Sequence, residues 1–486
     1  MTTSQSRSPS GSGWRPLDTL SVGGWVILVI AAVSTVAVAF WPVEQREGMD
    51  LWTFAQNHGD LYKRLSVDYN KQAVAEGRPP VNVFVLDQNA LMRRTISGFW
   101  SGTPLADLIE VQRMNLSRFV SGPIEDVGFT DLTDRLREEG LDKKINAPSF
   151  SPWISRGRIF GLPHDVHPVM LCYRADLVEQ AGIDVSEIET WADFARVMKP
   201  LVADLDGDGR PDRYLINLWY NSVNEVPLLL SQAGGGTFDK DGNSLIASDA
   251  NAMVIAHVVA WSTGRTRIAI DAPDFSASGN QLKIEGKVVA QLMPDWLAGV
   301  WKRNLPQLGG KLKLMPLPAW TPGGRRTSVR GGTMIAIPKK VDDFEAAWAY
   351  AKHLYLSKEL ARELFEASTI ISPVRELWDE DFYKVSDPYF SGQSSGSLYI
   401  EHAPDVPFRT SNPFFVLAQG RIIEASAALL REVEAGKIVP PDELTPEALI
   451  PRAKELLEIA EAKVLKQMQQ NVFLREASEQ QKGGGA

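Results

Sequence analysis

Four aspartates near the middle of the chain have the spacing of a cation-binding loop. Asp204, Asp206, Asp208 and Asp212 occupy relative positions 1, 3, 5 and 9, and a glycine stands at position 6, where an EF-hand loop turns sharply. Carboxylate oxygens are ligands that calcium prefers. Position 12 is Leu215 rather than the bidentate glutamate, so a complete EF-hand is excluded. The pattern predicts either a structural calcium site or an acidic turn whose Asp and Gly residues serve turn geometry.

The chain lacks the short motifs that mark common catalytic chemistries. Its six histidines are scattered, without a His-Glu-x-x-His pair, and no phosphate-binding Gly-x-x-x-x-Gly-Lys-Ser/Thr loop occurs. Ser97-Gly98 and Ser101-Gly102 do not form a Gly-x-Ser-x-Gly elbow. The 60 carboxylates contain many pairs, so no glycosidase pair can be singled out. These absences argue against an enzyme and against a cofactor, and a hydrolase stays open as an alternative.

The composition excludes several classes of protein. The 486 residues are 44% hydrophobic and 23% charged, which excludes a fully disordered chain. The formal net charge is 51 − 60 = −9, which argues against a nucleic-acid partner, since that would need a basic face. The single cysteine, Cys172, excludes an internal disulfide and a Cys-rich zinc site. It also lies too deep in the chain to carry an N-terminal lipid.

An uncharged apolar segment follows the polar N-terminus. Residues 23–41 contain no charged side chain in 19 positions, and a helix of that length spans ~28 Å, close to the ~30 Å core of a bilayer. Trp25 and Trp41 stand at its ends, where amphipathic rings favour the interface. The Lys/Arg excess precedes the segment. We predict a disordered cytoplasmic tail over residues 1–22 and a transmembrane anchor over residues 23–41.

Two other interpretations of this segment stay open. Ala37-Val38-Ala39 fits a signal-peptidase site, and cleavage there would free the rest of the chain. A buried core helix is the third possibility. The anchor and the signal peptide both place the remainder outside the cytoplasm.

The remainder alternates short apolar runs with helical patterns. This alternation predicts an α/β body with mostly parallel sheets. A C-terminal helix over residues 446–477 is expected to pack on the body rather than form a coiled coil, because no heptad is sustained, and residues 479–486 form a flexible tail. The expected strands are 50–54, 81–86, 214–218 and 332–338, and the expected helices are 61–74, 190–202, which opens on a capping box, and 344–355.

A series of motifs in order along the chain resembles the extracellular solute-binding proteins of ABC importers, specifically their large sugar-binding group. The motifs are Leu51-Trp52-Thr53-Phe54, Asp107-Leu108-Ile109-Glu110-Val111-Gln112, Gly161-Leu162-Pro163-His164-Asp165-Val166-His167-Pro168, Tyr173-Arg174-Ala175-Asp176, Ala181-Gly182-Ile183, Thr190-Trp191, Gly286-Lys287-Val288-Val289-Ala290 running into Asp295-Trp296, and Gly331-Gly332-Thr333-Met334. The resemblance covers residues 49–430. The family's small-Cys lipoprotein site is absent, and the apolar span stands in its place.

The resemblance implies the two-lobe periplasmic-binding-protein fold of type II, with the ligand in an interlobe cleft, here preceded by one N-terminal transmembrane helix. Lobe 1 would comprise residues 49–163 with 332–375, and lobe 2 residues 164–331 with 376–478. The chain would cross between the lobes near residues 163–169, at Gly331-Gly332 and near residues 371–375. Two glycines suit a hinge because glycine tolerates large changes in φ and ψ.

The resemblance also implies a sugar site, which needs aromatic platforms for the C–H faces and polar side chains for the hydroxyls. Such side chains occur where strands are expected to end, which is where α/β crevices bind ligands. The candidate binding residues are Asn57, His58, Glu110, Gln112, Asp165, His167, Trp219, Tyr220, Asn221, Asp295, Trp296, Arg330, Gly331 and Gly332.

Structural roles remain open for most of these residues. Asn57, His58 and Asp295 could cap helices, and Glu110 and Gln112 could be surface residues beside a strand. Asp165 and His167 could form a hinge network without touching the ligand. The remaining side chains could serve core packing or surface ion pairs, as Trp219, Tyr220 and Arg330 illustrate.

The implied function is the binding of a sugar or oligosaccharide on the extracytoplasmic (periplasmic) face of a bacterial membrane and its delivery to the permease subunits of an ABC transporter. The membrane would be a partner through the N-terminal helix, and nucleic acid would not be a partner. A membrane-tethered ligand sensor and, less favoured, an extracytoplasmic glycoside hydrolase are the alternatives.

Overall fold

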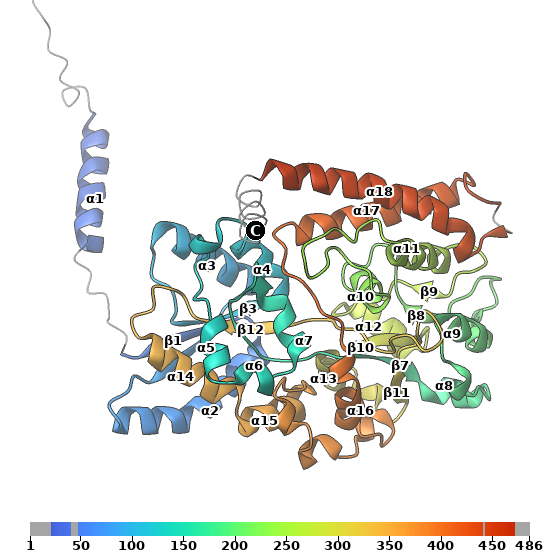
Figure 1. The fold of residues 1–486 in the computed structure, drawn as a ribbon, viewed down its shortest axis with the longest axis horizontal. Coiled ribbons are helices and arrows are strands. Elements are labelled where there is room, and N and C mark those ends of the chain that lie inside the picture. The colour runs from blue at the N-terminus through green and yellow to red at the C-terminus, as the bar shows by residue number, and fades with distance from the viewer. Residues whose placement is uncertain (1–20, 40–46, 441–442, 472–486) are drawn as a thin grey trace, which may run out of the picture. The chain divides into compact units, whose positions relative to one another are not determined.

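The computed structural model describes residues 21–39, 47–440 and 443–471. The chain divides into two compact units, Met1–Glu47 and Gly48–Ala486 (Figure 1). Residues 1–20 of the predicted N-terminal tail (1–22) and the predicted C-terminal tail (479–486) lie outside the described part and stay predictions, whereas Val22 is not part of a tail but the first residue of a helix. Each unit is described by itself below.

The first unit contains one described helix, α1 (Val22–Ala39), within the segment predicted to be helical. Its apolar side chains are exposed, with exposed fractions of 82% for Val22, 69% for Ile27 and 63% for Val33. Among the residues that the structure describes, no helix combines the length and the apolarity needed to cross a membrane.

The second unit contains two five-stranded sheets (Figure 1). The first sheet has the order β2-β1-β3-β12-β6, and the second has the order β11-β7-β10-β8-β9. The strands of the first sheet are β1 (Met49–Thr53), β2 (Val81–Val85), β3 (Leu108–Gln112), β6 (Leu162–Pro163) and β12 (Thr333–Ala336). The strands of the second sheet are β7 (Val169–Arg174), β8 (Tyr214–Asn217), β9 (Ala269–Ile270), β10 (Val288–Pro294) and β11 (Leu312–Pro316). A separate hairpin is formed by β4 (Ile154–Ser155) and β5 (Arg158–Ile159).

Both sheets are mixed, so the expectation of mostly parallel sheets was wrong. In the first sheet β1 is parallel to β2 and β3, but β12 is antiparallel to β3 and β6. In the second sheet β10 and β9 are parallel to β8, but β7 is antiparallel to β10 and β11. The two reversed strands, β7 and β12, are each the first strand after a crossing between the sheets.

Strand residues of the first sheet alternate between two apolar clusters. Leu51 and Leu108 pack into one cluster, and their neighbours Trp52 and Ile109 pack into the other. Successive side chains of a strand point to opposite faces, so both faces of this sheet are covered. The helices beside it are α2 (Gln56–Ala75), α3 (Gln88–Ser101), α4 (Arg113–Phe119), α5 (Thr133–Glu138), α6 (Leu141–Lys144), α7 (Ala147–Phe150), α14 (Phe344–Tyr355) and α15 (Lys358–Ser368).

Helices also cover the second sheet. They are α8 (Ala175–Gln180), α9 (Trp191–Val197), α10 (Glu225–Gln232), α11 (Asp249–Ser262), α12 (Ala277–Ile284), α13 (Asp295–Asn304), α16 (Ser395–His402), α17 (Phe415–Glu434) and α18 (Pro446–Gln470). The capping box that opens α9 is confirmed, since Thr190 accepts from the Asp193 amide and Asp193 accepts from the Thr190 amide. The helix ends at Val197 rather than near residue 202, because Pro200 lacks an N–H and disfavours helix in the residue before it.

Three chain segments run side by side between the two sheets. The amide of His164 donates to the carbonyl of Thr333 over 3.0 Å, and the amide of Val169 donates to Ser328 over 3.1 Å. The amide of Val166 donates to Ile371 over 3.3 Å, which adds the third segment. These bonds lie where the crossings were expected, while the boundaries of the lobes stay a prediction.

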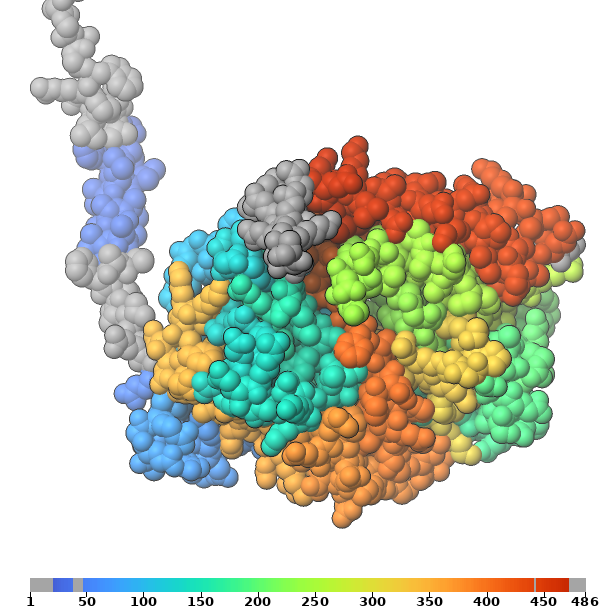
Figure 2. Space-filling model, in the orientation of Figure 1, coloured from blue at the N-terminus to red at the C-terminus, as the bar shows by residue number. Residues whose placement is uncertain are grey.

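The C-terminal helix packs on the body, as predicted. In Figure 2 the C-terminal segment lies over the yellow-green region that contains α11. Leu449, Ala453, Leu457, Ala460 and Val464 recur every three or four residues along α18 and are buried in the core of the second sheet. This spacing gives the helix one apolar face.

We expect Leu457→Ala to lower the free energy of unfolding by about 2–5 kcal/mol, since it removes a fully buried side chain and leaves a cavity. Ile459→Ala is the matched control, because Ile459 lies on the same helix and is 50% exposed. Urea unfolding measures both. Equal losses in the two variants would contradict the packing of α18.

Candidate functional site

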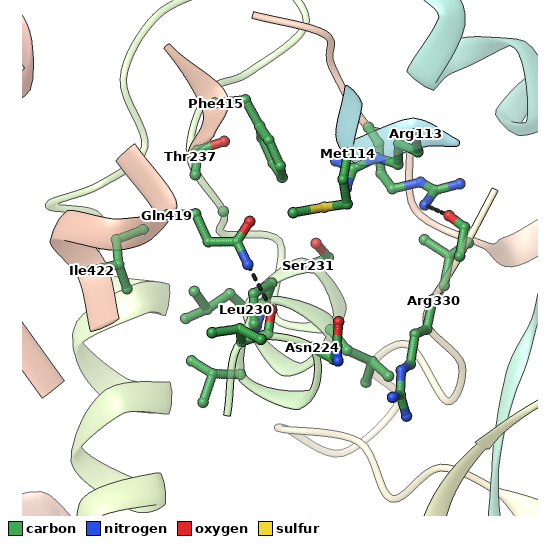
Figure 3. A pocket seen from close by; sticks show the side chains of 18 of the residues that line it. Arg113, Met114, Asn224, Leu230, Ser231, Thr237, Arg330, Phe415, Gln419 and Ile422 are labelled. Carbon is green, nitrogen blue, oxygen red and sulfur yellow. Dashed lines mark hydrogen bonds between the residues drawn. The ribbon is translucent and has the colours of Figure 1, made fainter. Parts of the chain in front are cut away.

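A cavity of about 270 Å³ lies between elements of the first sheet and elements of the second. From the first side come Gln112, at the end of β3, and the first residues of α4. From the second side come α10, α17 and the start of α13 (Figure 3). The cavity is near the lower end of the ~300–1,000 Å³ range of small-molecule sites. Four of the predicted residues line it, namely Gln112, Trp296, Arg330 and Gly331.

Trp296 is held against the crossing segment by its indole nitrogen. Nε1 donates to the carbonyl oxygen of Arg330 over 2.8 Å. Phe275 stacks on the indole, with ring centroids 6.2 Å apart and an interplanar angle of 2°. Trp296 opens α13 directly after the buried strand β10, so its position is fixed by the sheet. The cavity therefore has an aromatic wall on a rigid support.

Arg330 also lines the cavity, but its charge is compensated within the protein. One guanidinium nitrogen lies 3.0 Å from Glu225 and 3.1 Å from Asp274. Asp274 also binds Lys283 over 3.0 Å. Burial raises the pKa of Glu225, and the charge of Arg330 offsets part of that rise. Arg330 is thus committed to an internal ion-pair cluster, and its carbonyl oxygen orients Trp296.

Position 331 requires glycine because two aromatic side chains lie close to its backbone. Gly331 has φ +107° and Gly332 has φ +124°, backbone angles that L-residues with a side chain rarely adopt. A Cβ atom on Gly331 would lie 2.7 Å from Cδ2 of His167 and 2.9 Å from Nε1 of Trp296. The crossing chain can therefore pass between these two rings only as glycine. Gly332 does not line the cavity.

His167 lies behind this wall, between two buried carboxylates. Nδ1 lies 2.7 Å from Oδ1 of Asp295, and Nε2 lies 3.0 Å from Oδ2 of Asp165. Both ring nitrogens can donate only if the ring is an imidazolium. Burial alone would lower the pKa of His167, but the two carboxylates raise it to about 10. None of the three side chains lines the cavity.

The same carboxylates tie the three crossing segments together. Asp165 accepts from the amide of Thr333 over 3.2 Å, and Asp295 accepts from the amide of Ile371 over 2.8 Å. Asp295 also accepts from the amide of Trp296, at the start of α13. His167 itself has φ +59°. The geometry is that of a network at the crossings, which was one of the two interpretations of Asp165 and His167.

Glu110 and His58 form a second buried network inside the first sheet. Glu110 accepts from the hydroxyls of Tyr62, Tyr355 and Thr53, and His58 lies 3.2 Å away. Burial alone would raise the pKa of Glu110, but the charge of His58 and these hydrogen bonds lower it to about 2. One ring nitrogen of His58, one ring nitrogen of His164 and one carboxylate oxygen of Glu110 lie within 4.8 Å of one another, as the ligands of a metal ion would. These residues do not line the cavity.

The other candidates lie outside the cavity. Exposed Asn57, near the start of α2, donates to the Ser368 hydroxyl over 3.1 Å. Trp219 contacts the guanidinium of Arg267, whose Cζ atom lies 5.2 Å from the ring centroid. Tyr220 packs against the core of the second sheet, and Asn221 is exposed.

The Asp-rich loop is exposed and is held by its own carboxylates. Asp204 accepts from the amides of Gly207 and Gly209 over 2.7 and 2.8 Å, and these bonds lower its pKa. The carboxylates of Asp204, Asp206 and Asp208 lie within 4.8 Å of one another, without Asp212. The hydrogen bonds account for the turn, and calcium binding by the loop stays a prediction.

Several lining residues escaped prediction. Arg113 directly follows Gln112, so the end of the predicted strand could have indicated it. Asn224 lies three residues beyond Asn221, in the loop after β8, so the predicted residues of that loop stopped short of it. Arg409, Phe415 and Gln419 lie far beyond the last described strand, so no strand end pointed to them. They reach the cavity only because α10 and α17 pack beside it.

Comparison with known proteins identifies the family. A family model described as bacterial extracellular solute-binding protein matches residues 70–360, and the chain belongs to this family. Membership in a family of solute-binding proteins confirms the predicted class, a binding protein rather than an enzyme.

Known proteins resemble this chain in sequence and in fold. The arabinooligosaccharide-binding protein of Bacillus subtilis is 25% identical over 74% of this chain and 83% of its own length, and that of Halalkalibacterium halodurans is 24% identical over 72% and 76%. The sugar-binding protein MalE of Xanthomonas citri has a TM-score of 0.64 at 17% identity, over 86% of this chain and 99% of that one. The two mixed sheets therefore form the two-lobe periplasmic-binding-protein fold that was predicted.

We expect His167→Asn to destabilise the protein by about 3–5 kcal/mol at pH 6.5, because it leaves two buried carboxylates without their cation. Asparagine tolerates the positive φ of this position. The pKa of His167 is higher in the folded than in the unfolded state, so its stabilisation is complete below about pH 6.5 and is lost as the pH rises through about 10.

Urea unfolding of wild type and variant across pH 6.5–10 tests this, and the difference between them should shrink as the pH rises. His353→Asn is the control, because burial lowers the pKa of His353 and no such loss is expected. A difference independent of pH would contradict a charged His167.

Proposed function

We propose that this protein binds a sugar or oligosaccharide in the cavity between its two lobes, outside the cytoplasm, and delivers it chemically unaltered to an ABC transporter permease. The observation that carries this proposal is a cavity lined by elements that belong to both sides of the molecule, those of the first sheet and those packed on the second, with aromatic rings and uncharged hydrogen-bonding side chains in its wall. The names of the relatives, arabinooligosaccharide-binding and lactose-binding proteins, support the ligand class.

The wall offers both kinds of contact that a sugar needs. Trp296 and Phe415 line the cavity with aromatic rings, and sugar C–H groups pack on the faces of such rings. Gln112, Asn224 and Gln419 carry amide groups that can donate to and accept from hydroxyls. Each such hydrogen bond contributes a net ~1 kcal/mol, so several of them with one or two ring faces support micromolar binding after the cost of association.

Closure of the lobes is part of the proposal. Lobe 1 is assigned to residues 49–163 with 332–375, and lobe 2 to residues 164–331 with 376–478. A ligand that contacts both lobes has a higher affinity for the closed form and shifts the population toward it, and the transporter would bind that form. On this proposal the network of Asp165, His167 and Asp295 supports the wall from behind.

We also propose that residues 23–41 anchor the protein to the membrane, with the body on its outer face. The segment carries no charge, and the described apolar side chains of α1 are largely exposed. Mass analysis of the mature N-terminus distinguishes an anchor from a cleaved signal peptide. The solute-binding family is extracellular, which agrees with this placement.

We expect Trp296→Ala to weaken sugar binding by about 1–3 kcal/mol while the body stays folded, because the variant removes the aromatic face of the cavity. A thermal-shift screen of the purified body against sugars, polyols and oligosaccharides finds the best ligand, and calorimetry measures its affinity. Trp100→Ala is the matched control, since Trp100 is 89% exposed and does not line the cavity.

Wild-type affinity in Trp296→Ala would contradict the assignment of the cavity. Chromatography of the sugar after incubation should show it unchanged, and new reducing ends would instead support a hydrolase.

Calcium binding by the loop of Asp204, Asp206, Asp208 and Asp212 has its own test. A bound ion would relieve the repulsion between these carboxylates, so calcium is expected to raise the melting temperature, with reversal by a chelator. Asp206→Asn should abolish the rise. A melting temperature that calcium does not change would leave the loop as an acidic turn.

A further inference from the structure

The charges that line the cavity all have one sign. Arg113, Arg330 and Arg409 belong to its wall, and no Asp or Glu side chain lines it in the described part of the chain. A neutral sugar is usually held by acceptors as well as donors, because each hydroxyl both donates and accepts. Strong acceptors of the carboxylate kind are missing from this wall.

Two of the three arginines lack a carboxylate partner. Arg330 is paired with Glu225 and Asp274, as described above. Within residues 47–440 and 443–471, neither Arg113 nor Arg409 has an Asp or Glu oxygen within 4.0 Å. Their positive charges are therefore left uncompensated by contact pairs.

The two guanidinium groups are held in place by other contacts. Cζ of Arg113 lies 4.4 Å from the ring centroid of Phe415, and Arg409 donates to the carbonyl oxygen of Gly331. Arg113 and Phe415 both line the cavity (Figure 3). The Nε atoms of Arg113 and Arg409 are shielded from solvent and have no hydrogen-bond partner. The wall thus contains two half-buried guanidinium groups that are held in place, and the Nε–H group of each has no protein partner in the described part of the chain.

Burial of these charges is costly. Burial lowers the pKa of Arg113 well below its ordinary value, and the charge of Arg409 lowers it further. Burial likewise lowers the pKa of Arg409 to about 10, and the more distant Asp165, already bound to His167, offsets part of that effect. Two like charges that repel each other in a buried wall are relieved by an anion between them.

Gln419, on α17, adds an unused polar atom to the same wall. Its side chain is 8% exposed, and its Nε2 atom donates to the carbonyl oxygen of Val223 over 2.6 Å. Its Oε1 atom is buried and has no partner. Figure 3 shows the amide of Gln419 on the same side of the cavity as Phe415, the ring on which Arg113 stacks.

We propose that the cavity selects an anionic saccharide, whose carboxylate or phosphate group is held by Arg113 and Arg409 while a ring hydroxyl binds Gln419. This proposal rests on the proposed sugar-binding function and specifies its ligand. Arginine presents paired N–H donors in a plane that matches a carboxylate or phosphate group, which favours a direct ion pair over a hydroxyl contact.

Matched pairs of sugars test the proposal on the wild-type body. Calorimetry compares galacturonate with galactose and digalacturonate with galactobiose, and galactose 6-phosphate distinguishes a phosphate ligand from a carboxylate ligand. We expect at least one acidic sugar to bind roughly 10- to 100-fold more tightly than its neutral counterpart, as charged hydrogen bonds imply.

The variants Arg113→Gln and Arg409→Gln should each weaken binding of the acidic sugar far more than binding of its neutral counterpart, and so remove most of this preference. Arg118→Gln, exposed on the same helix as Arg113, is the control and should bind like wild type. Neutral sugars that bind as tightly as acidic ones to the wild type would overturn the inference and leave the sugar-binding function standing. Failure of every saccharide, neutral or acidic, would overturn both.

Discussion

The interlobe region depends on one buried cation between two buried carboxylates. The imidazolium of His167 bridges Asp165 and Asp295, and each carboxylate also accepts from a backbone amide of another crossing segment. Buried charges of this kind are tolerated only when they are paired and hydrogen-bonded. The network therefore fixes the three segments relative to one another, and the cavity wall is built on them.

The shape of the cavity wall depends on this network. Asp295 holds the start of α13, which places Trp296 beside the crossing chain, and the chain passes between Trp296 and His167 only because Gly331 has no Cβ atom. The carbonyl oxygens of Arg330 and Gly331 then bind the Trp296 indole and the Arg409 guanidinium. Residues that never touch a ligand thus decide where the ligand-facing groups stand.

The positively charged side chains in this region fall into two groups. Arg330 and His167 are matched by carboxylates within the protein, so they serve structure. Arg113 and Arg409 are oriented by a ring and a carbonyl oxygen, and no carboxylate of the described residues is in contact with them. On our proposal an anionic ligand in the cavity compensates their charge. This difference separates the supporting residues from those proposed to select the ligand.

The sequence by itself determined the family, the two-lobe α/β fold and four of the cavity residues, because strand ends and motif order are local features that one chain displays. Gln112 ends a strand and Trp296 stands two residues after one, so both could be found in this way. Only the tertiary structure decided that His58 and Glu110 face a core, that Asp165 pairs with His167, and that Arg409 and Gln419, far along the chain, close the cavity. The physical reason is that pairing and burial depend on contacts between distant segments, which residue type and spacing do not specify.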